Sequence, residues 1–230
     1  MSFVESENLR DTFSSETSVQ PEIAPARPSY VPTGKRIFDV GVTMLLMPIA
    51  LPLFLILYLI VRADGGPGLF GHTRVGKDGK PFVCWKLRSM CVDSDQRLQR
   101  HLDQNPDALS EWQDNRKLSL DPRITRIGRL IRRTSLDELP QFFNVLRGNM
   151  SLVGPRPVTD EELLRYGRYS RVYLSVKPGV TGLWQVSGRN RTTYARRIAM
   201  DSHYVANQSL LLDSAIVAKT VLVVLRATGR

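Results

Sequence analysis

Two adjacent carboxylates, Asp137 and Glu138, stand in the stretch 134–141, directly after a segment rich in arginine. Ser135 precedes Glu138 by three residues, which is the spacing of a capping box at a helix N-terminus. One interpretation is therefore structural: Glu138 caps a helix, and Asp137 is a favourable acid in its first turn. The other is chemical, because one carboxylate can attack phosphorus and form an acyl phosphate, while its neighbour offers hard oxygen ligands for Mg²⁺.

Arg156 is a second candidate for phosphate chemistry, and it lies between Pro155 and Pro157 in the segment 148–157. The prolines fix an irregular turn and give the arginine a set direction, and a guanidinium binds phosphate in a two-pronged fashion. An exposed arginine on a rigid loop is the alternative. The segment 177–190, KPGVTGLWQVSGRN, adds backbone donors, an aromatic face and a basic residue that could hold a nucleotide, although it matches no phosphate-loop fingerprint.

A short amphipathic helix is expected just before the two carboxylates. Apolar residues recur there at helical spacing, and arginines fill the gaps: Ile124, Ile127, Leu130 and Ile131 alternate with Arg123, Arg126, Arg129, Arg132 and Arg133. This pattern is typical of a segment lying on an anionic membrane surface. A solvated helix with an apolar face toward the core explains it equally well. The position of the segment after a long apolar run favours the membrane.

That apolar run extends from residue 40 to residue 61 without a charged side chain. About 20 apolar residues cross a bilayer as a helix, so the run predicts membrane insertion. Pro48 and Pro52 lie in its middle, and each removes a backbone donor and clashes with the preceding turn. Two structures accommodate them: a kinked spanning helix, or a re-entrant helix–break–helix that returns to the same face.

The charges at the ends of the run favour re-entry. Lys35 and Arg36 precede the run and Arg62 follows it, and basic flanking residues stay on the cytoplasmic side of a membrane. Both ends are therefore expected in the cytoplasm, with the helix broken at Pro48 or Pro52.

Composition divides the chain into three parts. Residues 1–33 are polar, acidic and rich in proline, and such a segment cannot bury enough apolar area to fold, so we predict a disordered tail. Residues 34–63 form the re-entrant segment, and residues 64–230 form a cytoplasmic domain that carries the candidate catalytic residues. The net charge of +10 indicates an anionic partner, such as acidic lipid, a phosphorylated ligand or nucleic acid.

The predicted fold class is α+β, mostly helical with a small sheet. Residues 69–70, 74–75 and 82–87 have strand character around a turn at 77–80, and residues 93–117 have helical character. The pattern gives no strand order. Association with the membrane is expected through the one re-entrant segment and through amphipathic helices on the surface.

Five stretches of the chain resemble the monotopic phosphoglycosyl transferases, also called the bacterial sugar transferase family. They run in the family's order: KRIFDV (35–40), FGHTRVGKDGKPFVCWKLRSM (70–90), DPRITRIGRLIRRTSLDELPQFFNVLRGNMSLVGPRP (121–157), KPGVTGLWQVSGRN (177–190) and DSHYVANQSLLLD (201–213). SLDELPQ followed by MSLVGPRP is highly specific. DSHYV and DNRKL are most similar to the subgroup that starts exopolysaccharide repeat units on undecaprenyl phosphate with galactose or glucose phosphate.

The resemblance implies transfer of a hexose phosphate from a UDP-sugar to undecaprenyl phosphate with release of UMP, at the cytoplasmic face of a bacterial inner membrane. Asp137 matches the nucleophile, which would carry the phosphosugar covalently. Glu138 matches the second acid, which would orient the site or, with Asp137, bind Mg²⁺. Arg156 matches the arginine that meets phosphate, and Lys86 and Arg88 match basic residues near the active site that bind substrate phosphate.

The family also uses a re-entrant helix broken at a proline that commonly follows serine. Here Met47 precedes Pro48, so Pro48 and Pro52 both remain candidates for the break. A non-catalytic membrane-bound scaffold for polysaccharide assembly is the alternative function, and it predicts that Asp137 is dispensable. A nucleic-acid binder would leave the apolar run unexplained and lacks a recognition motif, so no nucleic-acid partner is expected. The sequence assigns neither the sugar nor the oligomeric state, and a homodimer is compatible with it.

Overall fold

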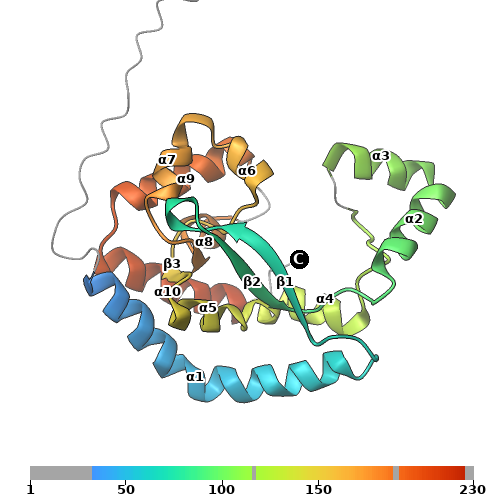
Figure 1. Cartoon of the computed structure of the whole chain (residues 1–230), viewed down its shortest axis with the longest axis horizontal. Coiled ribbons are helices and arrows are strands. Elements are labelled where there is room, and N and C mark those ends of the chain that lie inside the picture. The colour runs from blue at the N-terminus through green and yellow to red at the C-terminus, as the bar shows by residue number, and fades with distance from the viewer. Residues whose placement is uncertain (1–32, 116–117, 189–191, 226–230) are drawn as a thin grey trace, which may run out of the picture.

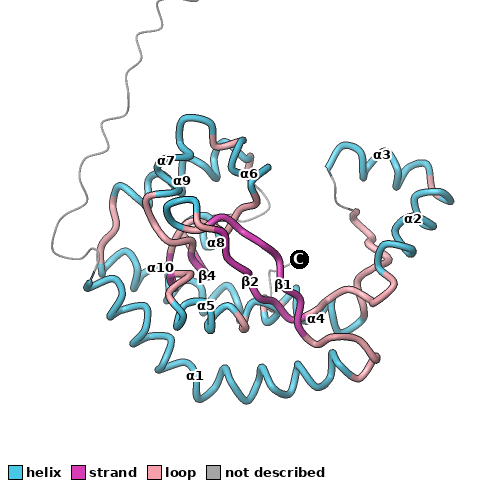
Figure 2. The backbone as a smooth tube through the Cα atoms, viewed as in Figure 1, coloured by secondary structure: helices cyan, strands magenta, loops and turns pink. Residues whose placement is uncertain are grey.

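The computed structural model describes residues 33–115, 118–188 and 192–225 of the chain. Most of them are helical and few lie in strands, which confirms the expected mostly helical α+β fold (Figure 2). The tail predicted to be disordered over 1–33 lies outside these ranges except for Thr33. In chain order the elements are α1 (Thr33–Arg62), β1 (Leu69–Val75), η2 (Lys77–Gly79), β2 (Pro81–Leu87), α2 (Ser94–Gln104), α3 (Pro106–Asn115), α4 (Arg126–Arg133), η3 (Leu136–Glu138), α5 (Gln141–Arg147), β3 (Ser151–Val153), α6 (Asp160–Leu164), η4 (Gly167–Tyr169), α7 (Ser170–Leu174), β4 (Gly179–Thr181), α8 (Leu183–Val186), α9 (Tyr194–Ala206) and α10 (Leu210–Leu225).

The apolar run forms most of α1, which follows one side of the molecule and bends near its middle (Figure 1). Pro48 and Pro52 lie inside α1, and the helical conformation continues through both. The prolines therefore accompany a bend and not an interruption of the helix. Among the described residues α1 is the one helix long and apolar enough to cross a membrane, and 17% of its most apolar stretch is buried within the protein. This exposure indicates membrane association, while the re-entrant path stays a prediction.

The strands expected around residues 69–87 pair as an antiparallel hairpin, β1 with β2, in the register Leu69 to Leu87 and Val75 to Pro81. The turn between them contains Asp78 at φ +58°, a left-handed conformation that aspartate tolerates better than most residues. The side chain of Asn144 on α5 fastens this hairpin, because its Nδ2 donates to the Val83 carbonyl at 2.8 Å. The hairpin and α5 are thereby held side by side.

A second, parallel pair of strands, β3 with β4, was outside the sequence prediction because each strand has only three residues. The connection between them passes through η4 and α6–α7, as a parallel pair requires a crossover. Gly154 and Gly179 let the two backbones meet, since a Cβ on Gly179 would overlap the Gly154 nitrogen. Of this pair, β3 packs with α9 and α10 in an apolar cluster that includes Leu152, Val153 and Tyr204.

The expected amphipathic helix is α4, and its apolar face is largely used inside the protein. Ile131 is fully buried, and Ile127 packs with it against the cluster formed by Leu57, Val61 and Leu87 from α1 and β2. The interpretation of this face as a membrane-binding surface is therefore wrong for Ile131, because the hairpin and α1 cover it. Leu130 is 54% exposed and stays available for the predicted membrane contact.

The helical character predicted over 93–117 is confirmed by α2 and α3, apart from residues 116–117, which lie outside the described ranges. These two helices project away from the rest of the molecule (Figure 1).

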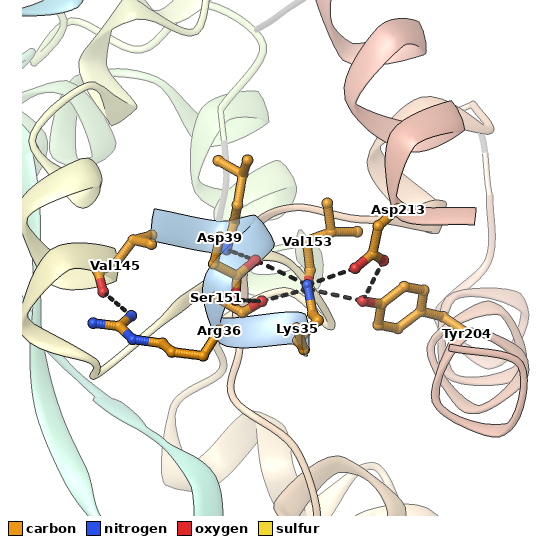
Figure 3. Close-up of polar contacts among 9 residues, drawn as sticks. Lys35, Arg36, Asp39, Val145, Ser151, Val153, Tyr204 and Asp213 are labelled. Carbon is orange, nitrogen blue, oxygen red and sulfur yellow. Dashed lines mark hydrogen bonds and ion pairs between the residues drawn. The ribbon is translucent and has the colours of Figure 1, made fainter. Parts of the chain in front are cut away.

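A cluster of buried charges fixes the beginning of α1 to the C-terminal part of the chain (Figure 3). Lys35 Nζ lies 2.9 Å from Asp39 Oδ1 and 2.8 Å from Asp213 Oδ2 on α10. Asp39 also accepts hydrogen bonds from Ser151 Oγ at 2.7 Å and from the Leu152 backbone at 3.1 Å. We call Lys35, Asp39 and Asp213 the Lys35 cluster.

Arg36, next to this cluster, fastens α1 to the end of α5. Its guanidinium donates to the carbonyls of Val145 at 2.6 Å and Leu146 at 2.9 Å. These carbonyls belong to the last turn of α5, where carbonyl groups lack the i+4 partner of a helix interior. The helix α1 is thereby connected to the helix that follows the two candidate carboxylates.

Candidate active site

Asp137 and Glu138, which we call the acidic dyad, lie in the single turn η3 between α4 and α5. The capping-box interpretation of this segment is wrong. Ser135 has φ +59°, and its side chain makes no capping hydrogen bond, because the left-handed residue forms the turn through its carbonyl, which accepts from the Glu138 backbone at 3.2 Å. Thr159 and Glu162 form a capping box at α6 instead.

Lys86, near the end of β2, joins both members of the acidic dyad. Its Nζ lies 3.2 Å from Asp137 Oδ2 and 2.8 Å from Glu138 Oε1. Lys86 meets two residues that follow it by 51 and 52 positions in the sequence, because α5 is fastened to the hairpin. The sequence motifs placed Lys86 near the dyad without fixing which atoms it contacts, and the structure brings these three predicted residues together.

The pKa values of Asp137 and Lys86 are both raised, for different reasons. Burial raises the pKa of Asp137, an effect that the positive charge of Lys86 opposes. Burial alone would lower the pKa of Lys86, but the negative charges of Glu138 and Asp137 outweigh it and raise that pKa. Lys86 is therefore a firmly charged cation, and Asp137 depends on it to remain ionised.

A pocket of about 300 Å³, a volume that includes open solvent, lies beside this triad. Three of the residues predicted from the sequence contribute to its wall, namely Lys86, Glu138 and Arg156. Asp137 is deeper, with 8% of its surface exposed, and reaches the pocket through Lys86. The full lining is Arg74, Cys84, Lys86, Glu138, Gln141, Arg156, Pro157, Val180 and Gln185.

Arg156 is the pocket cation best placed to receive a phosphate. Lys86 is committed to the dyad, and Arg74 pairs with Glu162 at 2.9 Å. No ion pair within the described ranges involves Arg156, whose guanidinium carbon lies 5.7 Å from the centre of the Trp184 ring. The expected direction of Arg156 between its two prolines is thus toward the pocket.

Arg88 does not share this pocket, although the sequence motif places it two residues after Lys86. The strand ends at Leu87, so the alternation of side chains no longer holds at Arg88. Its guanidinium donates instead to the Val61 carbonyl at 2.9 Å and to Asp64. Arg88 therefore secures the C-terminal end of α1, and its predicted contact with substrate phosphate has no geometric support in this structure.

Some pocket residues had no assigned role in the sequence analysis. Gln141 lies in the SLDELPQ motif and is 2% exposed, and Arg74 precedes the turn of the hairpin. The alternation of side chains along β1 was the only sequence signal that could have placed Arg74 at the pocket. Val180 and Gln185 line the pocket and belong to the segment 177–190, which could hold a nucleotide. The end of that segment, residues 189–190, lies outside the described residues.

The carboxylates of the acidic dyad could hold magnesium together with oxygen ligands from a substrate. Within the described ranges no group of three His, Cys, Asp or Glu residues could enclose a metal ion. The acidic dyad nevertheless offers two carboxylates, and Mg²⁺ is commonly held by one or two carboxylates together with substrate phosphates. The site therefore fits a magnesium ion that binds with its substrate.

The chain belongs to the bacterial sugar transferase family, which it matches over residues 30–227. It is 53% identical over 195 residues to an undecaprenyl-phosphate galactose phosphotransferase of Salmonella typhimurium, covering 85% of this chain and 41% of that protein. It is 48% identical over 196 residues to the exopolysaccharide production protein ExoY of Sinorhizobium fredii, covering 85% and 87%.

A third relative is the UDP-glucose:undecaprenyl-phosphate glucose-1-phosphate transferase of Escherichia coli, 37% identical over 196 residues that cover 81% of this chain and 39% of that protein. The chain thus spans about two fifths of the length of the Salmonella and Escherichia coli relatives. The similarity to ExoY extends over most of both chains.

Proposed function

We propose that this protein transfers a hexose 1-phosphate, galactose or glucose phosphate, from a UDP-sugar to undecaprenyl phosphate as the first membrane step of exopolysaccharide synthesis. The observation that carries the proposal is the acidic dyad joined by Lys86 at the edge of a pocket that also contains Arg156. Relatives named for galactose phosphate and glucose phosphate transfer to undecaprenyl phosphate support the same reaction.

The reaction divides into two displacements at one phosphorus. An Asp137 carboxylate oxygen attacks the sugar-linked phosphorus of the donor, the bond from that phosphorus to the bridging oxygen breaks, and UMP leaves with the electron pair. A phosphate oxygen of undecaprenyl phosphate then attacks the same phosphorus. The acyl phosphate bond breaks, which restores the carboxylate and yields undecaprenyl diphosphate sugar.

The pocket residues have matching tasks in this scheme. Arg156 binds the donor diphosphate, since a guanidinium pairs with phosphate oxygens through two parallel hydrogen bonds. The anionic donor competes with the dyad for Lys86, and movement of Nζ toward phosphate uncovers Asp137. Mg²⁺ held by Glu138 and Asp137 would offset the charge of the departing phosphate. A chain that presents these groups at the membrane surface shortens the search for a lipid acceptor.

We also propose that α1 enters and leaves the bilayer at the cytoplasmic face. Lys35 and Arg36 at its beginning and Arg88 at its end fasten both ends to the catalytic part of the chain. Because both ends are fastened to the catalytic part of the chain, a helix bent near its prolines would dip into one leaflet and keep the pocket near the headgroups.

The test is transfer by the full chain in vesicles that contain undecaprenyl phosphate. UDP-galactose, UDP-glucose and their N-acetylated counterparts, each labelled in the sugar, are supplied with magnesium or with a chelator. We expect labelled lipid and an equal amount of UMP with one of the hexose donors, and neither product with the chelator. Absence of labelled lipid with every donor would support the non-catalytic scaffold instead.

A further inference from the structure

The side chain of Arg156 pairs with no carboxylate among the described residues, so another contact must hold it in place. The contact at hand is the Trp184 ring, 5.7 Å from the guanidinium carbon. A guanidinium over an indole is attracted by the ring's electron-rich face. The position of Arg156 therefore depends on the position of Trp184.

Trp184 is itself held from two directions. Its Nε1 donates to Thr192 Oγ1 at 2.8 Å, and the guanidinium carbon of Arg197 on α9 lies 5.1 Å from the ring centre. One indole thus contacts two arginines, Arg156 at the pocket and Arg197 behind it. Displacing Arg197 would remove one of the two contacts that hold the ring next to the pocket arginine.

Arg197 is an unusual residue to bury. It is 6% exposed, its Nε lies 3.9 Å from Asp201 Oδ2, and its guanidinium carbon lies 5.2 Å from the Tyr194 ring centre. Among the residues that the structure describes, its Nε and Nη2 find no hydrogen-bond partner. Replacing a buried ion pair with well-packed apolar residues is often neutral or stabilising, so the burial of this pair is weak evidence for a purely structural role.

Asp201 supplies the countercharge and belongs to the same arrangement. It accepts a hydrogen bond from Tyr166 at 2.7 Å. Burial raises its pKa to about 6, against the lowering effects of that hydrogen bond and of the positive charges on Arg197 and Arg156. Arg156 thus acts electrostatically on a residue of α9, which ties the pocket and this helix together.

We propose that Arg197 is a positioning residue for the sugar-nucleotide donor: paired with Asp201, it fixes the Trp184 ring, and the ring holds Arg156 toward the donor phosphates. The inference rests on the proposed function and adds to it a residue that lines no part of the pocket. Because Arg197 acts through the phosphate-binding arginine, its effect falls on donor binding and spares the lipid acceptor.

The test compares Arg197→Gln and Arg197→Lys with Arg196→Gln. Arg196 is the exposed neighbour on α9, so its replacement removes the same charge without touching Trp184. In Arg197→Gln we expect the donor KM to rise about tenfold, the effect of a desolvated cation–π contact, with kcat and the acceptor KM within about twofold of wild type. Arg197→Lys should recover only part of the donor affinity, since an ammonium lacks the planar group that stacks.

Thermal unfolding and equilibrium binding of UMP accompany the kinetics. UMP binding weakened in Arg197→Gln and normal in Arg196→Gln supports the inference even if wild type transfers no sugar, an outcome that would overturn only the proposed function. Unchanged donor KM and UMP binding in both Arg197 variants would overturn the inference. So would a uniform loss of active protein that leaves the donor KM and UMP affinity of the remainder normal, because that is the result of a purely structural arginine.

Discussion

Lys35 and Lys86 each join two carboxylates at similar distances, yet the two clusters differ in what surrounds them. Lys35 lies 2.9 and 2.8 Å from its partners, and Lys86 lies 3.2 and 2.8 Å from the acidic dyad. The Lys35 side chain is 12% exposed and its partners 4% and 0%. The Lys86 side chain is 31% exposed and its partners 11% and 26%.

The difference separates a structural cluster from the one to which we assign the proposed chemistry. The Lys35 cluster is completed by donors of its own, such as Ser151 and the Leu152 backbone, and it connects α1 with β3 and α10. A buried polar network that is satisfied makes the structure rigid. The Lys86 cluster opens on a pocket where a phosphate can take the place of a carboxylate. Composition alone does not distinguish the two, whereas exposure and remaining hydrogen-bonding capacity do.

The largest expected effect comes from Asp137→Asn. It should reduce sugar-phosphate transfer by about a thousandfold or more, because the proposed nucleophile is lost. The thermal unfolding midpoint should stay the same or rise, since burial disfavours the charge that the change removes. Asp107→Asn, at an exposed position on α3, is the control. Full activity of Asp137→Asn would remove the dyad from the chemistry.

The counterpart in the other cluster is Asp213→Asn. It should lower the free energy of unfolding by about 3–5 kcal/mol, the usual effect of breaking a buried ion pair by removing one partner. The donor and acceptor KM values of the folded fraction should stay normal. Denaturant unfolding and steady-state kinetics measure the two quantities. A variant of normal stability and abolished transfer would instead place the Lys35 cluster in the catalytic machinery.

A smaller effect, on pH dependence, is expected from Lys86→Gln. The Asp137 pKa is raised by burial and held down by Lys86, and attack requires the ionised carboxylate. Wild-type kcat/KM should therefore fall as the pH falls through that pKa. Without the ammonium the pKa rises further, so the acid limb should move to higher pH. Lys86→Arg keeps the charge and should leave the limb near its original place. An acid limb unmoved in Lys86→Gln would contradict the assigned electrostatics.

The smallest effects distinguish Arg88 from Arg156, both of which the sequence motifs assigned to substrate phosphate. Arg88→Lys should destabilise the fold by about 1–2 kcal/mol, through loss of hydrogen bonds at the end of α1, with the donor KM unchanged. Arg156→Lys should raise the donor KM severalfold, since lysine lacks the two-pronged phosphate geometry, with unfolding unchanged. The reversed pattern would return Arg88 to the phosphate site.

The sequence predicted the elements whose signals are local. The apolar run predicted α1, and the residues around a Lys-Asp-Gly turn predicted the hairpin. The motif residues supplied Lys86, Glu138 and Arg156 of the nine residues that line the pocket. The pairing of β3 with β4 was beyond such reasoning, because three-residue strands carry no periodic pattern and their partners are set by the crossover that joins them.

Errors of the sequence analysis arose where tertiary contacts decide. Ser135 has the spacing of a capping residue, but the chain turns back there through a left-handed residue. Ile131 has the pattern of a membrane face, but α1 and the hairpin cover it. Arg88 follows Lys86 in a motif, yet the strand ends between them. Each pattern was compatible with two environments, and only the packing chose one.

The measurement that tests the central claim most directly is retention of label on the protein in the absence of any lipid acceptor. The full chain, Asp137→Asn and Glu138→Gln are each incubated with magnesium and UDP-sugar labelled in the sugar-linked phosphate, then denatured and separated from free nucleotide. We predict stable label and stoichiometric UMP for wild type and no label for Asp137→Asn. Label that persists in Asp137→Asn and disappears in Glu138→Gln would assign the nucleophile to the more exposed acid, and no label on any protein that still makes lipid product would contradict the covalent mechanism.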